Sequence, residues 1–264
     1  MRSSEHRHVY SAPNRIRSVR LMLKLLSIVL FALSPTFLLA QLHVYGPGGP
    51  LAPMKECADL YKKQTGTDVL VTAGPEKQWF QSAQNDADLV YGGADYMLNQ
   101  FALEHLGFLL PNTRAELYDR AIGILVRPGN PKHLQSLDDL ARPGVRLLDV
   151  DGAGQVGVWE DLAGRKGLIG ALQVNIAASV QNTALGIEAW NAHPDLDAWI
   201  TFESWAKRMP DKVQLVRLPE AERLYRGTPI EVAARSSQPV KAQEFIDFLK
   251  TPVAHAVFVK WGWR

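Results

Sequence analysis

The sequence predicts an α/β fold in which strands alternate with helices and lie mostly parallel within their sheets. Two observations carry this prediction. A short strand, a glycine corner and an amphipathic helix follow one another three times within residues 42–106. The same unit returns at residues 145–162, after a buried strand at 121–126 that the prolines and glycine of 127–131 end. We therefore place a domain crossover at 127–131 and expect a second sheet beyond it.

The three units of the first sheet share one order of elements. They are strand 42–45, corner 46–50 and a helix ending at Gly66; strand 68–72, corner 73–75 and helix 76–85; and strand 87–91, corner 92–93 and a helix through Tyr96 and Leu106. Loops that follow parallel strands emerge at one edge of a sheet, so the three corners should lie together. Backbone N–H groups at glycine turns and helix starts suit an anion. The alternative is ordinary turn chemistry.

The second sheet is expected from a further series of elements. Ser136, with Asp139 as its reciprocal partner, should cap a short helix. Strand 145–150 follows, and a corner at 151–157 opens a helix through Leu162. The stretches 168–171 and 174–180 fit either strand or helix, and the next helix is capped by Asn182 or Thr183. Strands are expected at 196–202 and 213–218, a return to the first domain at 230–234, and helices within 239–263.

Residues 1–40 are predicted to be a signal peptide. A basic region ends at Lys24, and an apolar run follows that Pro35 interrupts and that is short for a membrane span, so we expect cleavage after Ala40. The alternatives are an uncleaved anchor and a true start at Met22. The first 40 residues hold six of the 29 basic residues and one of the 27 acidic ones, which leaves a net charge of about −3 and no reason to expect nucleic-acid binding.

The sequence contains no recognisable motif of an enzyme. Cys57, the only cysteine, lies on the apolar side of the first helix and predicts a buried structural thiol, not a nucleophile. The histidines are dispersed, with neither a nucleophile elbow nor metal-ligand spacing. The spacing of Gly152, Gly154 and Gly157 is one position short of a dinucleotide fingerprint. We expect no catalysis, cofactor or metal, with a secreted hydrolase as the remaining alternative.

Several segments resemble a known family. The closing segment 241–263 is similar to that of periplasmic solute-binding proteins of ABC transporters, particularly the molybdate and sulfate class, and 130–145 resembles their entry into the second lobe. Within this class, four motifs resemble the accessory colonisation factor group, at 44–50, 72–75, 152–155 and 159–161. The resemblance implies a type II periplasmic binding fold with two hinge crossovers, with 41–122 and 230–264 as lobe 1 and 123–229 as lobe 2.

The resemblance also implies that the lobes close on an anion in their cleft. The residues expected to hold it are Gly48, Gly49, Thr72, Gly74, Gly93, Gly154, Gln155, Asn182 and Ser204. Molybdate binders present hydroxyl side chains in their first two loops, whereas here only Thr72 does so, which leaves the choice of anion open. Arg120 and Arg127 flank a hinge strand. We expect solvated surface positions for both, and the alternative is that they lend positive potential to the cleft.

Two further groups near the corners are interpreted in the same way. Asp149, Asp151 and Glu203 would repel a dianion, so we expect them to point to solvent or to cap helices. If they face the cleft instead, the alternative is a cationic or zwitterionic ligand. Trp79 and Trp159 fit either a pocket wall or the core.

The predicted function is capture of a small oxyanion, such as sulfate, molybdate or tungstate, in the periplasm by a monomer. The protein would deliver this anion to the permease of an ABC transporter. Two alternatives keep the fold: a ligand-loaded partner for a chemoreceptor, or a protein that binds a small organic acid.

Overall fold

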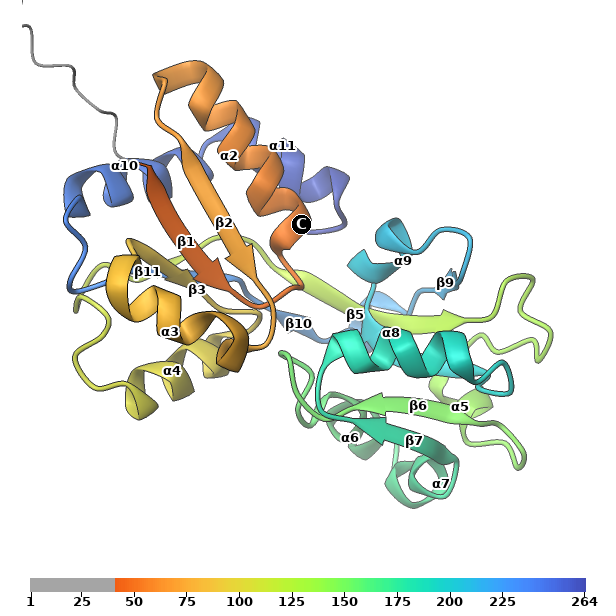
Figure 1. Cartoon of the computed structure of the whole chain (residues 1–264). Coiled ribbons are helices and arrows are strands. Elements are labelled where there is room, and N and C mark those ends of the chain that lie inside the picture. Colours follow the sequence, from red (N-terminus) through yellow and green to blue (C-terminus); the bar gives the residue numbers. More distant parts are fainter. Residues whose placement is uncertain (1–40) are drawn as a thin grey trace, which may run out of the picture. The chain divides into compact units, whose positions relative to one another are not determined.

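The computed structural model describes residues 41–264, and the predicted signal peptide lies outside the described residues. Two sheets flanked by helices form the structure, which confirms the predicted two-lobed α/β fold (Figure 1). Within 41–264, no helix has both the length and the apolar character that a membrane crossing requires.

The first sheet has the strand order β2-β1-β3-β11-β4. Its strands are β1 (Leu42–Gly46), β2 (Val69–Ala73), β3 (Leu89–Tyr91), β4 (Ala115–Glu116) and β11 (Pro229–Val232). β1 pairs in parallel with β2 and β3, whereas β11 runs antiparallel to β3 and β4. The parallel part of the sheet is thus the three repeated units, and the returning chain adds the antiparallel strand.

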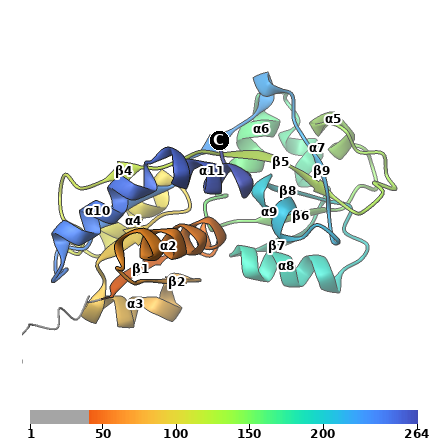
Figure 2. The ribbon, with the colours of Figure 1, turned by 90° about the horizontal axis from the view of Figure 1, so that it is seen from above.

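Alternation along these strands divides the packing between two faces. Leu42 and Val44 pack with the helices α2 (Leu51–Thr65), α10 (Pro239–Leu249) and α11 (Pro252–Lys260). Tyr45 and Val90 pack on the other face with α3 (Glu76–Asp86) and α4 (Asp95–Glu104). Figure 2 shows α2, α10 and α11 side by side. Both faces of the parallel strands are therefore buried, as parallel sheets require.

The second sheet has the order β10-β5-β8-β6-β7, with β9 also paired to β5. Its strands are β5 (Arg120–Val126), β6 (Leu147–Val150), β7 (Ile176–Val180), β8 (Ala198–Phe202), β9 (Gln214–Val216) and β10 (Tyr225–Arg226). β6 is parallel to β7 and β8, and β5 is antiparallel to β8. Its helices are α5 (Leu137–Leu140), α6 (Val158–Gly164), α7 (Ile169–Gln173), α8 (Thr183–Ala192), α9 (Ser204–Arg208) and the 3-10 turn η1 (Glu220–Glu222).

One expectation about the connections is wrong. β5 pairs with β10 from its first residue, and with β8 and β9 further along, so the chain enters the second sheet by Arg120 and not at 127–131. The segment 127–131 is a turn that ends β5. The lobe boundaries at 122/123 and 229/230 stay predictions.

Local signals for helix starts are confirmed. Ser136 Oγ accepts a hydrogen bond from Asp139 N at 3.2 Å, and Asn182 Oδ1 accepts one from Leu185 N at 3.0 Å. The stretches that fitted either structure divide into α7 and β7.

Candidate anion-binding site

The three glycine corners of the first sheet lie together. Gly74 N donates to Gly46 O at 3.0 Å, which joins the second corner to the first. Tyr91 at the end of β3 donates from its hydroxyl to Pro47 O at 3.0 Å. A Cβ placed on Gly93 would lie 3.2 Å from Pro47 Cγ. The parallel pairing of β1, β2 and β3 thus brings the corners to one edge, as the sequence predicts.

The fourth corner, between β6 and α6, meets this edge from the second sheet. Gly154 has a φ of +88°, and a Cβ there would lie only 2.7 Å from Gly93 O. Val156 N donates to Tyr96 Oη at 3.3 Å across the same junction. Glycine is required at position 154 both by the left-handed backbone and by the close approach of the other loop.

Arg120 lies beside these corners and is buried, so its expected surface position is wrong. Its guanidinium carbon is 3.6 Å from the centre of the Phe202 ring and 5.1 Å from that of Trp263. Nη2 donates to Gly93 O, and a Cβ on Gly49 would lie 2.7 Å from Nη1. The side chain therefore reaches from the start of β5 to the glycine corners.

The charge of Arg120 has no acidic partner within residues 41–264. Its Nε is buried without a hydrogen-bond partner there. Burial lowers the pKa of Arg120 to about 9, so the guanidinium remains positive at neutral pH. A buried charge without a partner costs several kcal/mol (about 3–5). An anion that accepts its hydrogen bonds would offset this cost.

A second arginine reaches the first corner from the other sheet. Arg208, in the last turn of α9, donates from Nη1 to Gly48 O at 2.8 Å and to Gly49 O at 3.4 Å. Its guanidinium carbon lies 4.3 Å from the Trp205 ring centre, and burial lowers its pKa. No sequence pattern selects Arg208, because a basic residue at the end of a short helix ordinarily interacts with the helix dipole.

The predicted ligand residues lie in different surroundings. Gly48, Gly49, Gly93 and Gly154 lie at the junction described above. The N–H groups of Gly74 and Gln155 donate within the chain, to Gly46 O and Gly152 O. Their roles in binding, like those of the remaining predicted residues, stay predictions.

The side chains predicted to donate to the anion differ in their burial and in the hydrogen bonds they already form. Gln155 donates from Nε2 to Thr183 Oγ1 at 3.2 Å, while its Oε1 is buried without a partner among 41–264. Asn182 caps α8 through its side chain. Thr72 is half-buried on β2, and Ser204 is buried in the first turn of α9.

Two of the three acidic residues, Asp149 and Glu203, are held by contacts outside the arginine pair. Ser179 Oγ donates to Asp149 at 2.7 Å, and Asp151 is exposed. Glu203 pairs with Arg217 at 3.0 Å. The carboxylates of Asp149 and Glu203 thus have contacts other than Arg120 and Arg208, and Asp151 is exposed to solvent.

The remaining aromatic and basic candidates serve packing. Trp79 is buried against Tyr45 and Phe101, with Nε1 donating to Gly74 O at 3.1 Å, and it lines a cavity of about 50 Å³ beside the corners. Trp159 packs against the core of the second sheet. Arg127 donates to Leu196 O at 2.7 Å and stacks on Trp190, so it holds a loop and is not simply solvated.

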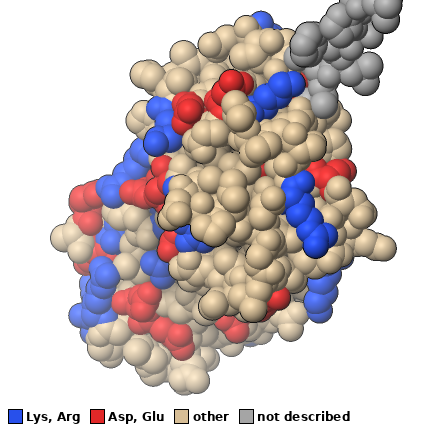
Figure 3. Space-filling model, turned by 90° about the vertical axis from the view of Figure 1, so that its left-hand side faces the viewer, with Lys and Arg blue, Asp and Glu red and all other residues tan. Residues whose placement is uncertain are grey.

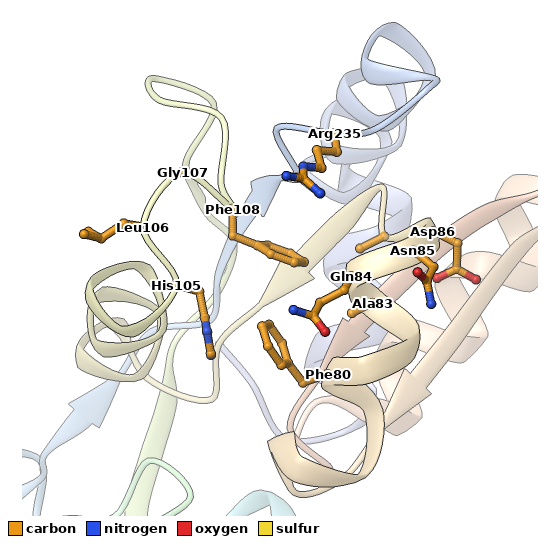
Figure 4. A pocket seen from close by; sticks show the side chains of 12 residues that line it. Phe80, Ala83, Gln84, Asn85, Asp86, His105, Leu106, Gly107, Phe108 and Arg235 are labelled. Carbon is orange, nitrogen blue, oxygen red and sulfur yellow. The ribbon is translucent and has the colours of Figure 1, made fainter.

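A larger cavity lies elsewhere, between α3 and the loop after α4. It measures about 250 Å³, and Phe80, His105 and Phe108 lie along it with Arg235 at its rim (Figure 4). Near it, Glu76, Glu104 and His105 bring ligand atoms within 4.8 Å of one another. A 2.7 Å hydrogen bond between His105 Nε2 and Glu76 Oε1, and one from Gln100 Nε2 to Glu104 Oε1 at 2.8 Å, account for that arrangement. Basic and acidic side chains are interspersed on the face drawn in Figure 3, so no extended basic surface forms there.

Residues 42–264 match the family model for bacterial extracellular solute-binding proteins. The chain belongs to this family. Its structure is similar to that of PEB3 with L-phospholactate bound, at 33% identity and a TM-score of 0.78, covering 84% of this chain and 99% of PEB3. A second PEB3 structure, from Campylobacter jejuni, gives 34% identity, a TM-score of 0.77 and the same coverage. No curated protein sequence matches.

More distant structures share the fold. The periplasmic molybdate-binding protein of Azotobacter vinelandii is 16% identical, with a TM-score of 0.65 over 84% of this chain and 98% of that protein. The sulfate-binding protein SubI of Mycobacterium tuberculosis H37Rv is 18% identical, with a TM-score of 0.67 over 85% and 86%. The resemblance stated from the sequence is thereby confirmed. Membership of an extracellular solute-binding family implies a periplasmic location and a role in ABC transport.

Proposed function

We propose that the protein binds a small anion between Arg120, Arg208 and the glycine corners, and delivers it to the permease of an ABC transporter. The observation that carries the proposal is the buried guanidinium of Arg120, which has no acidic partner within 41–264 and lies against two of the corners. Family membership supports the delivery step.

Among oxyanions, the site favours one with a phosphoryl or carboxylate group. A guanidinium presents paired donors whose spacing matches the oxygens of these groups, and also those of sulfate, so the ranking against sulfate rests on the similarity to PEB3. The first corner offers no hydroxyl, which weakens the case for molybdate or tungstate. PEB3, which is related over nearly its full length, binds L-phospholactate. We therefore place a small organic phosphate or carboxylate ahead of sulfate, molybdate and tungstate.

Isothermal titration of the exported protein tests this proposal. We expect heat with L-phospholactate, and weaker or no heat with sulfate, molybdate and tungstate. Arg120→Ala should weaken binding at least tenfold, because a charge-assisted hydrogen bond contributes about 1.5–3 kcal/mol. Arg127→Ala is the matched control, since that guanidinium binds carbonyls far from the corners. Absence of heat with every anion would refute anion binding.

The receiving partner and the export step are proposed on the family alone. A permease and ATPase encoded beside this protein would support transport, and a chemoreceptor would support signalling. N-terminal sequencing of the exported protein should begin at Gln41.

A further inference from the structure

We propose that Trp263 is a positioning residue for Arg120. Its ring holds the guanidinium against Phe202, so that the donors along the guanidinium edge keep a fixed direction toward an anion. This inference rests on the proposed function, because it names the part of the chain that makes Arg120 ready to bind.

The first step concerns the surroundings of the guanidinium. Its carbon lies 3.6 Å from the centre of the Phe202 ring and 5.1 Å from that of Trp263. An arginine side chain has many rotamers, and fixing one of them costs conformational entropy. Contacts with two rings offset this cost before a ligand arrives, so less affinity is lost on binding.

The second step concerns how Trp263 itself is held. Trp263 is buried, and its Nε1 donates to Thr228 Oγ1 at 2.9 Å. Its backbone forms an antiparallel bridge with Arg120, and its N donates to Phe258 O at 3.0 Å. The ring therefore has a fixed position relative to both the start of β5 and the residue before β11.

The third step concerns which donors remain. Nη2 donates to Gly93 O, while Nε has no partner within 41–264 and Nη1 lies beside Gly49. The rings contact the guanidinium face, and only its edge can donate hydrogen bonds. Nε and Nη2 share one edge, and Nη2 has a second N–H besides the one that Gly93 O accepts; such a pair of donors matches the spacing of phosphate or carboxylate oxygens.

The neighbouring Arg264 provides a matched control. It belongs to the same segment. Its Nη2 lies 3.2 Å from Asp119 Oδ2, and its guanidinium carbon lies 3.4 Å from the centre of the Tyr225 ring. Arg264→Ala therefore disturbs the segment and removes an interaction with the second sheet, but leaves the contact between Trp263 and Arg120 intact.

The experiment titrates L-phospholactate into the wild type and five variants. Trp263→Leu should weaken binding about tenfold, while Trp263→Phe, which keeps an aromatic face, should stay within about threefold. Arg264→Ala should bind like the wild type. In an Arg120→Ala background, Trp263→Leu should cause no further loss, because a residue that acts through Arg120 has nothing left to position. If Trp263→Leu does not fold, the nearly isosteric Thr228→Val should weaken binding about threefold.

Two results would overturn the inference: wild-type affinity in Trp263→Leu, or a full additional loss in the Arg120→Ala background. A readout without ligand separates it from the proposed function. Ring currents should shift the Nε–H resonance of Arg120, and Trp263→Leu should move it. If the wild type bound no anion, the proposed function would fail, and an unmoved resonance would refute the positioning as well.

Discussion

At the scale of single residues, the buried side chain of Arg120 gives the site a positive charge. The sequence places an arginine at the start of an apolar strand, where such side chains usually remain in water. Its burial depends on Phe202 and Trp263, which are distant in the sequence and whose rings the fold alone brings to it. No local pattern indicates such a contact, and the sequence therefore predicts a solvated surface position instead.

The lowered pKa of Arg120 predicts how anion binding depends on pH. Burial brings this pKa down to about 9, so the protein carries the binding charge below pH 9 and loses it above. Because a phosphoryl group loses its second proton at about pH 6, we expect constant affinity for L-phospholactate only from about pH 7.5 to 8, and a fall of up to about tenfold per pH unit above 9. Calorimetry in matched buffers measures this. Arg120→Ala should lose the dependence, and constant affinity to about pH 10.5 would show that the guanidinium stays protonated.

Cys57 illustrates a residue whose role could be predicted. The apolar side of α2 buries it, as expected from helical spacing, and burial raises the pKa of the thiol to about 12. Only the thiolate reacts readily with alkylating reagents. We expect no labelling by iodoacetamide at about pH 8 in the native protein and full labelling in denaturant, measured by mass spectrometry. Rapid labelling of the native protein would contradict the burial of this helix face.

The glycine corners belong to the scale of elements. Their recurrence and their meeting at one edge could be predicted, because hydrophobic periodicity and turn residues are local and parallel pairing aligns the loops. The sequence predicts the return of the chain near residue 230, but not the antiparallel direction of β11 or the entry into the second sheet by Arg120. Strand pairing depends on segments that are distant in the sequence. The apolar pattern of a buried strand such as 121–126 therefore does not indicate to which sheet the strand belongs.

Two corner glycines should differ in how much a substitution by alanine lowers the stability of the protein. Gly154 has a left-handed backbone, and a Cβ there would lie 2.7 Å from Gly93 O. Gly154→Ala should reduce the free energy of unfolding by about 1–3 kcal/mol and weaken anion binding. A Cβ on Gly48 would meet no atom within 4 Å, so Gly48→Ala should change stability by less than about 0.5 kcal/mol. Unfolding by denaturant measures the stability of the two variants. Equal free energies of unfolding would contradict the close contact between the corners.

At the scale of the whole molecule, the site joins groups from both sheets. Arg208 from α9 contacts the first corner, and Gly154 contacts the third. An anion bound there would interact with both sheets at once. Because a ligand favours the arrangement in which it makes most contacts, binding should narrow the range of separations between the lobes.

Spin labels can measure this narrowing. Leu106 is 84% exposed beyond α4 and Val174 is 82% exposed after α7, so a cysteine at each should accept a label without disturbing a core. The buried Cys57 should not compete for the reagent. Pulsed dipolar spectroscopy should give a narrower distance distribution with L-phospholactate than without it. The same pair in an Arg120→Ala background should not respond. A distribution that the anion leaves unchanged in the wild type, despite heat in calorimetry, would mean that binding does not select among arrangements of the lobes.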